Sequence, residues 1–194
     1  MSALPSPTMT ADEYLAYDAV QPGRHEFYNG DVVAMAGASE AHALVTANLT
    51  GALRNRLAGQ GGRVYSADLR VHVSDTEAFV YPDLCVVCGP SELLPTTPVT
   101  LVNPRVVVEV LSESTAAHDR GPKAAHYRRL PALGAYMLVS IEERRVEVYY
   151  RGEDGVWRLA EAQGDGVVEV PPLGLALPLT EFWAGLEELA PGPV

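Results

Sequence analysis

The chain contains almost no lysine. Of its fourteen basic residues, thirteen are arginines and one is a lysine, Lys123, in a sequence of 194 residues. Arginine is a delocalised fork that stays charged, whereas lysine is a compact point charge with a pKa that can move. A site that needs a small cation beside a reacting water therefore has a single candidate. The alternative is an arginine-biased composition with one stray surface lysine.

Long apolar runs, a leader and cysteine-rich segments are also missing. No apolar run approaches the roughly 18 residues of a membrane span, so we expect no membrane contact. Residues 1–5 lack the charged start and apolar centre of a secretory signal. With only two cysteines, the sequence favours the reducing cytoplasm as its location.

Positive net charge is absent too. The formal net charge is −11, and phosphate contacts need clustered basic groups. Contact with DNA would therefore require a local basic face on an acidic protein. Candidates for such a face, which are otherwise ordinary solvated surface, are Arg54, Arg56, Arg63, Arg120, Arg128 and Arg129.

Length and composition predict one domain. A chain of 194 residues that is 47% hydrophobic can bury one substantial core. The proline-containing segment 1–9 is interpreted as a disordered tail, and residues 10–190 as a single domain without an internal repeat.

Local patterns predict the elements of this domain. A capping box at Thr10–Glu13 opens a short helix, and Asn29-Gly30 between extended segments indicates a tight hairpin. Helices are expected at 10–19, 39–57, 114–130 and 180–189. Within 114–130, Pro122 is expected in the first turn of the main helix. Strands are expected at 24–27, 31–36, 64–66, 69–73, 79–87, 105–111, 135–140, 145–151 and 156–159. This order predicts an α/β fold with a mixed central β-sheet flanked by helices.

Two acids fall on predicted strands. If strands 79–87 and 105–111 are neighbours, Asp83 and Glu109 can converge, because alternate side chains share one face of a strand. A buried carboxylate is costly unless it meets a cation or hydrogen-bond donors. Two close carboxylates raise each other's pKa, and a divalent cation with oxygen ligands removes that conflict. The alternative is that Glu109 pairs with an arginine and Asp83 caps a turn after Pro82.

The two cysteines lie three residues apart on the strand that contains Asp83. Side chains three apart on a strand point to opposite faces, so Cys85 and Cys88 cannot share one metal ion there. Because no second Cys or His pair completes a tetrahedral set, we interpret both as buried apolar residues.

Three motifs in this order and spacing resemble the Uma2 family, also called DUF820: Tyr81-Pro82-Asp83-Leu84, Val108-Glu109-Val110-Leu111-Ser112, and Asp119 to Lys123 with Tyr127. The hairpin 26–30 and His42 fit the same pattern, so the resemblance covers about residues 10–185. Uma2 proteins are similar to the PD-(D/E)XK nucleases and are presumed to cut DNA. The resemblance implies a restriction-endonuclease-like core with an N-terminal hairpin and C-terminal β additions.

The same resemblance implies roles for individual residues. Asp83 and Glu109 would hold Mg²⁺ or Mn²⁺, with the Val110 carbonyl as the third oxygen, and Lys123 would position the attacking water and stabilise charge on the phosphate. The superfamily pattern has a lysine two residues after the second acid, where this chain has Leu111. Lys123 on the next helix would return a charge to the same place.

Further candidates each keep an alternative interpretation. Glu26 would bind a second metal or orient a water, or is an exposed hairpin acid. His42 is catalytic or a core histidine. Asp119 pairs with the lysine or caps its helix. Ser112 and Tyr127 would hydrogen-bond the phosphate or the ligands, unless Tyr127 is core.

These inferences together predict a metal-dependent endonuclease that hydrolyses DNA. Reaching both strands of a duplex favours a two-fold homodimer, with strands 136–139 and 146–150 as the candidate interface. One alternative is a non-catalytic interaction protein that keeps the fold, which Leu111 and the acidity favour. Another is a metal-dependent phosphoesterase acting on a small nucleotide, which would suit an acidic protein better than long DNA.

Overall fold

The computed structural model of the chain describes residues 9–35 and 37–189. The predicted tail, Met9 apart, lies outside the described residues. The described strands form two six-stranded sheets and one two-stranded sheet. We call the sheet with strand order β12-β11-β10-β9-β6-β3 the central sheet, and the sheet with order β2-β1-β5-β4-β8-β7 the side sheet.

The central sheet is mixed, as predicted. Its β9 and β10 run parallel, and its other neighbouring strands run antiparallel. All six residues of β9 are buried, which fits a strand covered on both faces. The strands are β3 (Gly62–Ser66), β6 (Leu84–Cys88), β9 (Val106–Leu111), β10 (Ala135–Ser140), β11 (Arg145–Arg151) and β12 (Trp157–Gln163).

The side sheet begins with the predicted hairpin. Asn29 and Gly30 both have positive φ, 47° and 108°, which the tight turn requires. The strands are β1 (His25–Tyr28), β2 (Asp31–Ala34), β4 (Arg70–Val73), β5 (Ala78–Val80), β7 (Leu93–Leu94) and β8 (Thr100–Leu101). Strands β7 and β8 lie between residues 87 and 105, where the sequence predicted no strand.

The predicted N-terminal helices are confirmed. Helix α1 (Ala11–Asp18) starts with a complete capping box between Thr10 and Glu13. Helix α2 (Glu40–Leu57) is capped by Ser39 and buries one face, which includes Val45 and Leu49. The remaining helical segments are α3 (Ala116–His118), the π-helical segment η2 (Asp119–Lys123), α4 (Ala124–Tyr127) and α5 (Thr180–Trp183), with 3-10 turns at Ser74–Thr76, Pro171–Leu173 and Leu186–Glu188.

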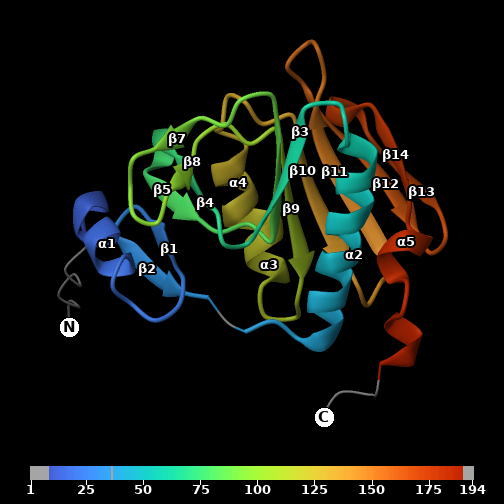
Figure 1. The fold of residues 1–194 in the computed structure, drawn as a ribbon, viewed down its shortest axis with the longest axis horizontal. Coiled ribbons are helices and arrows are strands. Elements are labelled where there is room, and N and C mark those ends of the chain that lie inside the picture. The colour runs from blue at the N-terminus through green and yellow to red at the C-terminus, as the bar shows by residue number, and fades with distance from the viewer. Residues whose placement is uncertain (1–8, 36, 190–194) are drawn as a thin grey trace, which may run out of the picture.

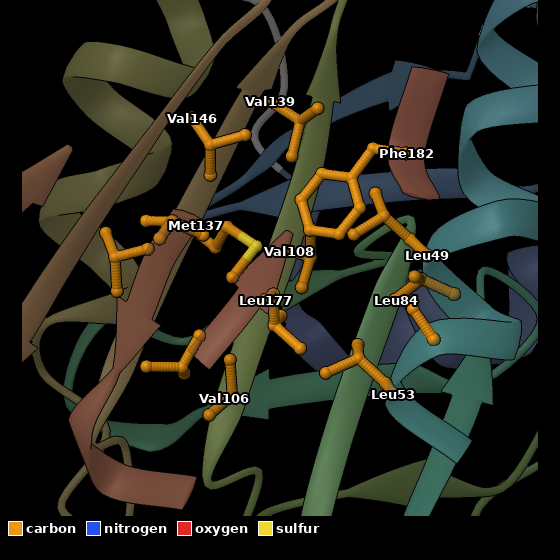
Figure 2. Close-up of a cluster of buried hydrophobic side chains, with 14 of the residues drawn as sticks. Leu49, Leu53, Leu84, Val106, Val108, Met137, Val139, Val146, Leu177 and Phe182 are labelled. Atoms are coloured by element: carbon orange, nitrogen blue, oxygen red, sulfur yellow. The ribbon is translucent and has the colours of Figure 1, made fainter. Parts of the chain in front are cut away.

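The central sheet lies between two layers (Figure 1). One face packs against α2, α5 and the small sheet of β13 (Val167–Val170) and β14 (Leu175–Pro178). The other face packs against α4 and strands β4, β5 and β8 of the side sheet. Figure 2 shows the first interface, where Leu49, Leu53 and Phe182 meet Val108 and Met137.

The predicted single strand 79–87 is wrong. It is two strands, β5 and β6, which belong to different sheets and are separated by Tyr81, Pro82 and Asp83. Proline has no N–H to donate to a sheet ladder, so it interrupts an interior strand. The chain uses this break to cross from the side sheet to the central sheet.

In the predicted helical stretch 114–130, the start of the main helix at Pro122 is wrong. It consists of α3, the π-helical η2 and α4, and Pro122 lies inside η2 rather than at a helix start. Proline removes one helical hydrogen bond and clashes with the carbonyl four residues earlier, which widens the turn. Within η2, Asp119 and Lys123 are the buried residues, so the wide turn directs both toward the interior.

The C-terminal part contains more strand than predicted. The last predicted strand ends at Leu159, whereas β12 continues to Gln163 and is followed by β13 and β14, which were not predicted. The sequence also predicts one helix over 180–189, where α5 ends at Trp183 and a 3-10 turn follows. These strands are short and partly exposed, so their hydrophobic pattern is weak.

The predicted dimer interface is wrong in its location. The residues of β10 are buried, and β11 is paired on both sides, with β10 and β12. The apolar pattern that suggested an interface is therefore the interior of the central sheet.

The core in Figure 2 makes a prediction about stability. Leu49 is fully buried in this cluster, so Leu49→Ala should lower the free energy of unfolding by about 3 kcal/mol, as lost burial and a cavity add. Leu159 is 48% exposed, and Leu159→Ala is the matched control, with an expected loss below about 1 kcal/mol. Urea unfolding measures both; equal losses would contradict the assigned core.

Candidate active site

The predicted acids meet where the two sheets adjoin. Strands β6 and β9 are antiparallel neighbours, with Leu84 opposite Val108, so Asp83 lies beside Glu109. The Asp83 backbone N–H lies 3.4 Å from Glu109 Oε2. Glu26 comes from β1 of the side sheet, so the site draws its carboxylates from both sheets.

Lys123 links these carboxylates. Its Nζ lies 2.9 Å from Glu26 Oε1, 2.9 Å from Glu109 Oε1 and 3.8 Å from Asp119 Oδ1. Only 5% of the residue is exposed, so the alternative of a stray surface lysine is wrong. Burial alone would lower the pKa of Lys123, but Glu109, Glu26 and Asp119 outweigh burial and raise it, so the ammonium stays charged.

Glu26 is not an exposed hairpin acid, since only 6% of the residue is exposed. Its Oε1 accepts hydrogen bonds from the Tyr81 backbone N–H (2.9 Å) and from Lys123, and its Oε2 accepts one from Tyr28 Oη (2.6 Å). Both oxygens therefore already have protein donors. This arrangement suits a residue that positions Lys123 better than a ligand of a second metal ion.

Glu109 is 3% exposed and accepts a hydrogen bond from Tyr127 Oη at 2.8 Å. Burial raises the pKa of Glu109 well above its usual range, Lys123 opposes that shift, and Asp83 and Asp119 add to it. Tyr127 is fully buried, so it is both a core residue and a hydrogen-bond partner of the acid.

Asp83 is the more accessible acid, with 16% of its side chain exposed. Its Oδ2 accepts hydrogen bonds from the Val110 backbone N–H at 2.7 Å and from His42 Nε2 at 3.1 Å. Among the described residues, no side chain or backbone group donates to Oδ1. Asp83 thus has one oxygen that is held by two donors. We call the place where the side chains of Asp83 and His42, 16% and 17% exposed, reach the surface the opening of the site.

His42 lies in the first turn of α2, where its backbone N–H donates to Ser39 Oγ. The hydrogen bond to Asp83 raises the pKa of His42, and partial burial opposes that rise. The core alternative is wrong for this histidine, because its ring contacts the site and 17% of its side chain is exposed.

The site holds more negative than positive charge. Four acids, Asp83, Glu109, Glu26 and Asp119, surround the single lysine, and burial also raises the pKa of Asp119. An added cation would relieve this imbalance.

The oxygens available for a cation fit Mg²⁺ in number and kind. Residues 9–35 and 37–189 contain no group of three or more His, Cys, Asp or Glu side chains with metal-binding geometry. Mg²⁺ is usually held by one or two carboxylates and keeps several waters. Asp83 Oδ1 and Glu109 Oε2 match that donor set, and the Val110 carbonyl is adjacent in sequence to Glu109.

Other predicted candidates lie outside this cluster. Ser112 Oγ lies 3.1 Å from Ser114 Oγ and 3.0 Å from Thr115 Oγ1, so its hydroxyl organises the turn before α3. Cys85 is buried and Cys88 is exposed, and both are free. Their different surroundings agree with opposite faces of β6, and the prediction that both are buried is wrong for Cys88.

The arginines proposed for DNA contact are mostly far from the site. Arg54 and Arg56 lie in the last turn of α2, twelve or more residues beyond His42, which is about 18 Å along a helix. Arg63 is opposite Val87 on β6, and the Arg128 carbonyl accepts from Arg151 at the far end of β11. Arg120 is next to the site but is paired with Glu147 at 2.9 Å.

Two tyrosines of the site, Tyr28 and Tyr81, lie within the sequence motifs, but the motifs gave neither a role. Tyr28 donates to Glu26, and the Tyr81 N–H donates to the same carboxylate. Tyr28 follows Glu26 by two residues, so strand alternation places both on one face and could have identified it. The role of Tyr81 depends on the crossing between sheets, for which the sequence has no local signal except Pro82.

Comparisons with known proteins agree with this mixed α/β fold. The crystal structure of a protein described as "a putative nuclease belonging to DUF820", from Anabaena variabilis, has the same fold, with a TM-score of 0.72 and 17% sequence identity. The match covers 92% of this chain and 99% of that chain.

The chain belongs to the Uma2 family, described as "Putative restriction endonuclease", which residues 11–180 match. The uncharacterized protein slr1290 of Synechocystis sp. is 32% identical over 94% of this chain and 95% of its own length. A second protein of that organism, sll1609, is 31% identical over 81% of this chain and 89% of its own length. The predicted family is therefore confirmed. Within the described residues, no helix has the length and apolar character needed to cross a membrane.

The charge balance predicts how stability depends on pH. Lys123→Met leaves Glu26 and Glu109 without their shared cation, and should cost about 3–5 kcal/mol at pH 8. Because folding raises the pKa of Glu109, ionisation of this acid costs stability as pH rises, and Lys123 offsets part of that cost. Below the pKa of about 4.3 that a glutamate has in the unfolded chain, Glu109 is protonated in both states and the cost vanishes. The deficit relative to wild type should therefore shrink as pH falls from 8 to 5.

Urea unfolding at several pH values measures this deficit. Arg144→Met is the control, because it breaks the ion pair with Glu187, whose two side chains are 41% and 80% exposed, and it should cost below about 1 kcal/mol. A deficit for Lys123→Met that does not change with pH would contradict the assigned charge balance.

Proposed function

We propose that this chain is a metal-dependent endonuclease that hydrolyses DNA phosphodiester bonds, with Mg²⁺ or Mn²⁺ as cofactor. The observation that carries the proposal is the convergence of Asp83, Glu109 and Lys123 at one opening, with an excess of buried acids over cations. Membership in a family described as "Putative restriction endonuclease" supports nuclease chemistry.

Asp83 and Glu109 would hold the divalent cation, with the Val110 carbonyl as a further oxygen. Once bound, the cation would lower the pKa of a water and neutralise the phosphate oxygens. The hydrogen bonds to Asp83 from Val110 and His42 fix Oδ2, which would leave Oδ1 for the cation. Because an ionised carboxylate only accepts hydrogen bonds, His42 Nε2 is the donor in this pair.

Lys123 would act as a fixed positive charge. Its raised pKa keeps it protonated, so it does not serve as a general base. Its Nζ lies 2.9 Å from Glu109, beside the acid that would bind the cation. From there it can donate a hydrogen bond to the attacking water and stabilise the charge that develops on the phosphate. Glu26, which shares this ammonium, holds it in place.

The first test concerns the metal ligand. Asp83→Asn keeps the size of the side chain but removes its charge, so Mn²⁺ binding measured by calorimetry should be lost, and nicking of supercoiled plasmid should fall at least about 100-fold. The exposed acid Asp75 gives the control Asp75→Asn, which should keep both. Unchanged heat of Mn²⁺ binding in Asp83→Asn would remove this acid from the site.

The second test concerns the lysine. Lys123→Arg keeps the positive charge, but the guanidinium fork cannot occupy a point-charge site, so kcat should fall about 10²- to 10³-fold. The Mn²⁺ dissociation constant should change less than about threefold, because Asp83 and Glu109 remain. Full activity in Lys123→Arg would exclude the lysine from the mechanism.

The distribution of arginines favours a second candidate, a metal-dependent phosphoesterase that acts on small nucleotides. Arg54, Arg63 and Arg128 are far from the opening, so long DNA would find few basic groups beside the acids. Cleavage of a mononucleotide diester in preference to plasmid and single-stranded DNA would favour this candidate. If the wild-type protein with Mn²⁺ cleaves none of these substrates, the better hypothesis is a non-catalytic interaction protein.

A two-fold homodimer belongs to the endonuclease proposal, because a duplex offers two strands to cut. Light scattering at micromolar concentration should give twice the monomer mass of 20.8 kDa. The interface would use surface other than β10, all six residues of which are buried. A monomeric mass would refute the dimer.

A further inference from the structure

A second polar cluster is buried in the side sheet, away from the acids described above. Arg70 on β4 is fully buried, and its Nη1 lies 2.8 Å from Oδ2 of Asp18, the last residue of α1. The guanidinium also donates to Thr100 Oγ1 at 2.9 Å and to the Pro98 carbonyl at 2.8 Å. A buried ion pair is stable only when such hydrogen bonds satisfy both partners.

Tyr81 connects this cluster to the candidate active site. Its hydroxyl donates to Asp18 Oδ2 at 2.7 Å, and its backbone N–H donates to Glu26 Oε1 at 2.9 Å. Glu26 Oε1 in turn lies 2.9 Å from Lys123 Nζ. A continuous series of short polar contacts therefore runs from the buried arginine to the lysine of the site.

Tyr81 also begins the segment that carries Asp83. The chain leaves β5 at Val80 and enters β6 at Leu84, so Tyr81, Pro82 and Asp83 belong to neither strand. At one end the segment is held by the two hydrogen bonds of Tyr81. At its other end, the Asp83 carboxylate accepts from the Val110 N–H at 2.7 Å.

The Asp18–Arg70 pair is well suited to hold this segment in place. Asp18 accepts from Arg70 and Tyr81 at one oxygen, and its other oxygen accepts from the His25 backbone N–H at 3.2 Å. The Asp18 side chain is 1% exposed, so water cannot replace a lost donor. His25 precedes Glu26, and Tyr81 lies two residues before Asp83. The Asp18 carboxylate therefore holds the chain beside both Glu26 and Asp83.

We propose that Asp18, Arg70 and Tyr81 are positioning residues, which set the placement of Asp83 and Glu26 relative to Lys123. This inference rests on the proposed function for its catalytic consequence only. Removal of the Tyr81 hydroxyl frees the segment before Asp83 while it leaves every group at the opening of the site chemically intact.

Tyr81→Phe is the variant that tests the proposal. The Val110 amide N–H donates to Asp83, so its NMR shift and hydrogen-exchange rate report where that carboxylate lies. In Tyr81→Phe, we expect this amide to shift and to exchange at least about tenfold faster. The Mn²⁺ dissociation constant should rise severalfold, and kcat for plasmid nicking should fall about tenfold while KM changes little.

Thr100→Val is the matched control, because it removes one buried hydroxyl from the far end of the same cluster. It should lower the urea midpoint of unfolding by about as much as Tyr81→Phe does, and leave the Val110 amide, Mn²⁺ affinity and kcat unchanged. If the cluster is merely structural, both variants should lose stability and keep every other property.

The outcomes separate this inference from the proposed function. If the Val110 amide in Tyr81→Phe matches wild type, the positioning role is overturned, whatever the activity of the protein. If the amide moves in Tyr81→Phe and stays in Thr100→Val, the positioning role holds even if wild type neither binds Mn²⁺ nor cleaves DNA. In that case only the proposed chemistry fails.

Discussion

The ion bridge from Lys123 to Glu26 and Glu109 is the interaction on which the site depends. Each carboxylate comes from a different sheet, and the ammonium lies 2.9 Å from both. An unpaired charge in such a buried place would be very costly, so the two sheets and the helical segment must form together. The same bridge leaves Asp83 and one oxygen of Glu109 for other partners, which connects the stability of the fold to the chemistry proposed for the opening.

Two irregularities of the backbone create this geometry, and proline is at the centre of both. Pro82 ends the side sheet's β5 and lets Asp83 enter the central sheet beside Glu109. Pro122 lies in the π-helical turn that buries Asp119 and Lys123 together. A single regular strand over 79–87 would keep Asp83 in the side sheet, apart from Glu109. Local departures from regular structure are common at functional sites.

Some of the candidate basic residues lie apart from the buried acids. The acids lie near the end of β9 and the start of α2, whereas Arg54 and Arg56 lie in the last turn of α2, at the opposite end of that helix (Figure 1). An anionic substrate would therefore be held at the site by a bound cation and by Lys123 more than by a basic surface. The size of the substrate is therefore an experimental question.

The sequence by itself determined the family, the order of most elements and the identity of the acids and the lysine. These features follow from local signals, such as the capping box at Thr10, the Asn29-Gly30 turn and the motifs around Asp83 and Glu109. Only the tertiary structure decided that 79–87 is two strands in two sheets, that β10 is interior, and that Tyr81 joins Asp18 to Glu26. Local propensity is read from neighbours in the chain, whereas these features depend on contacts between residues that are far apart in sequence and meet only after folding.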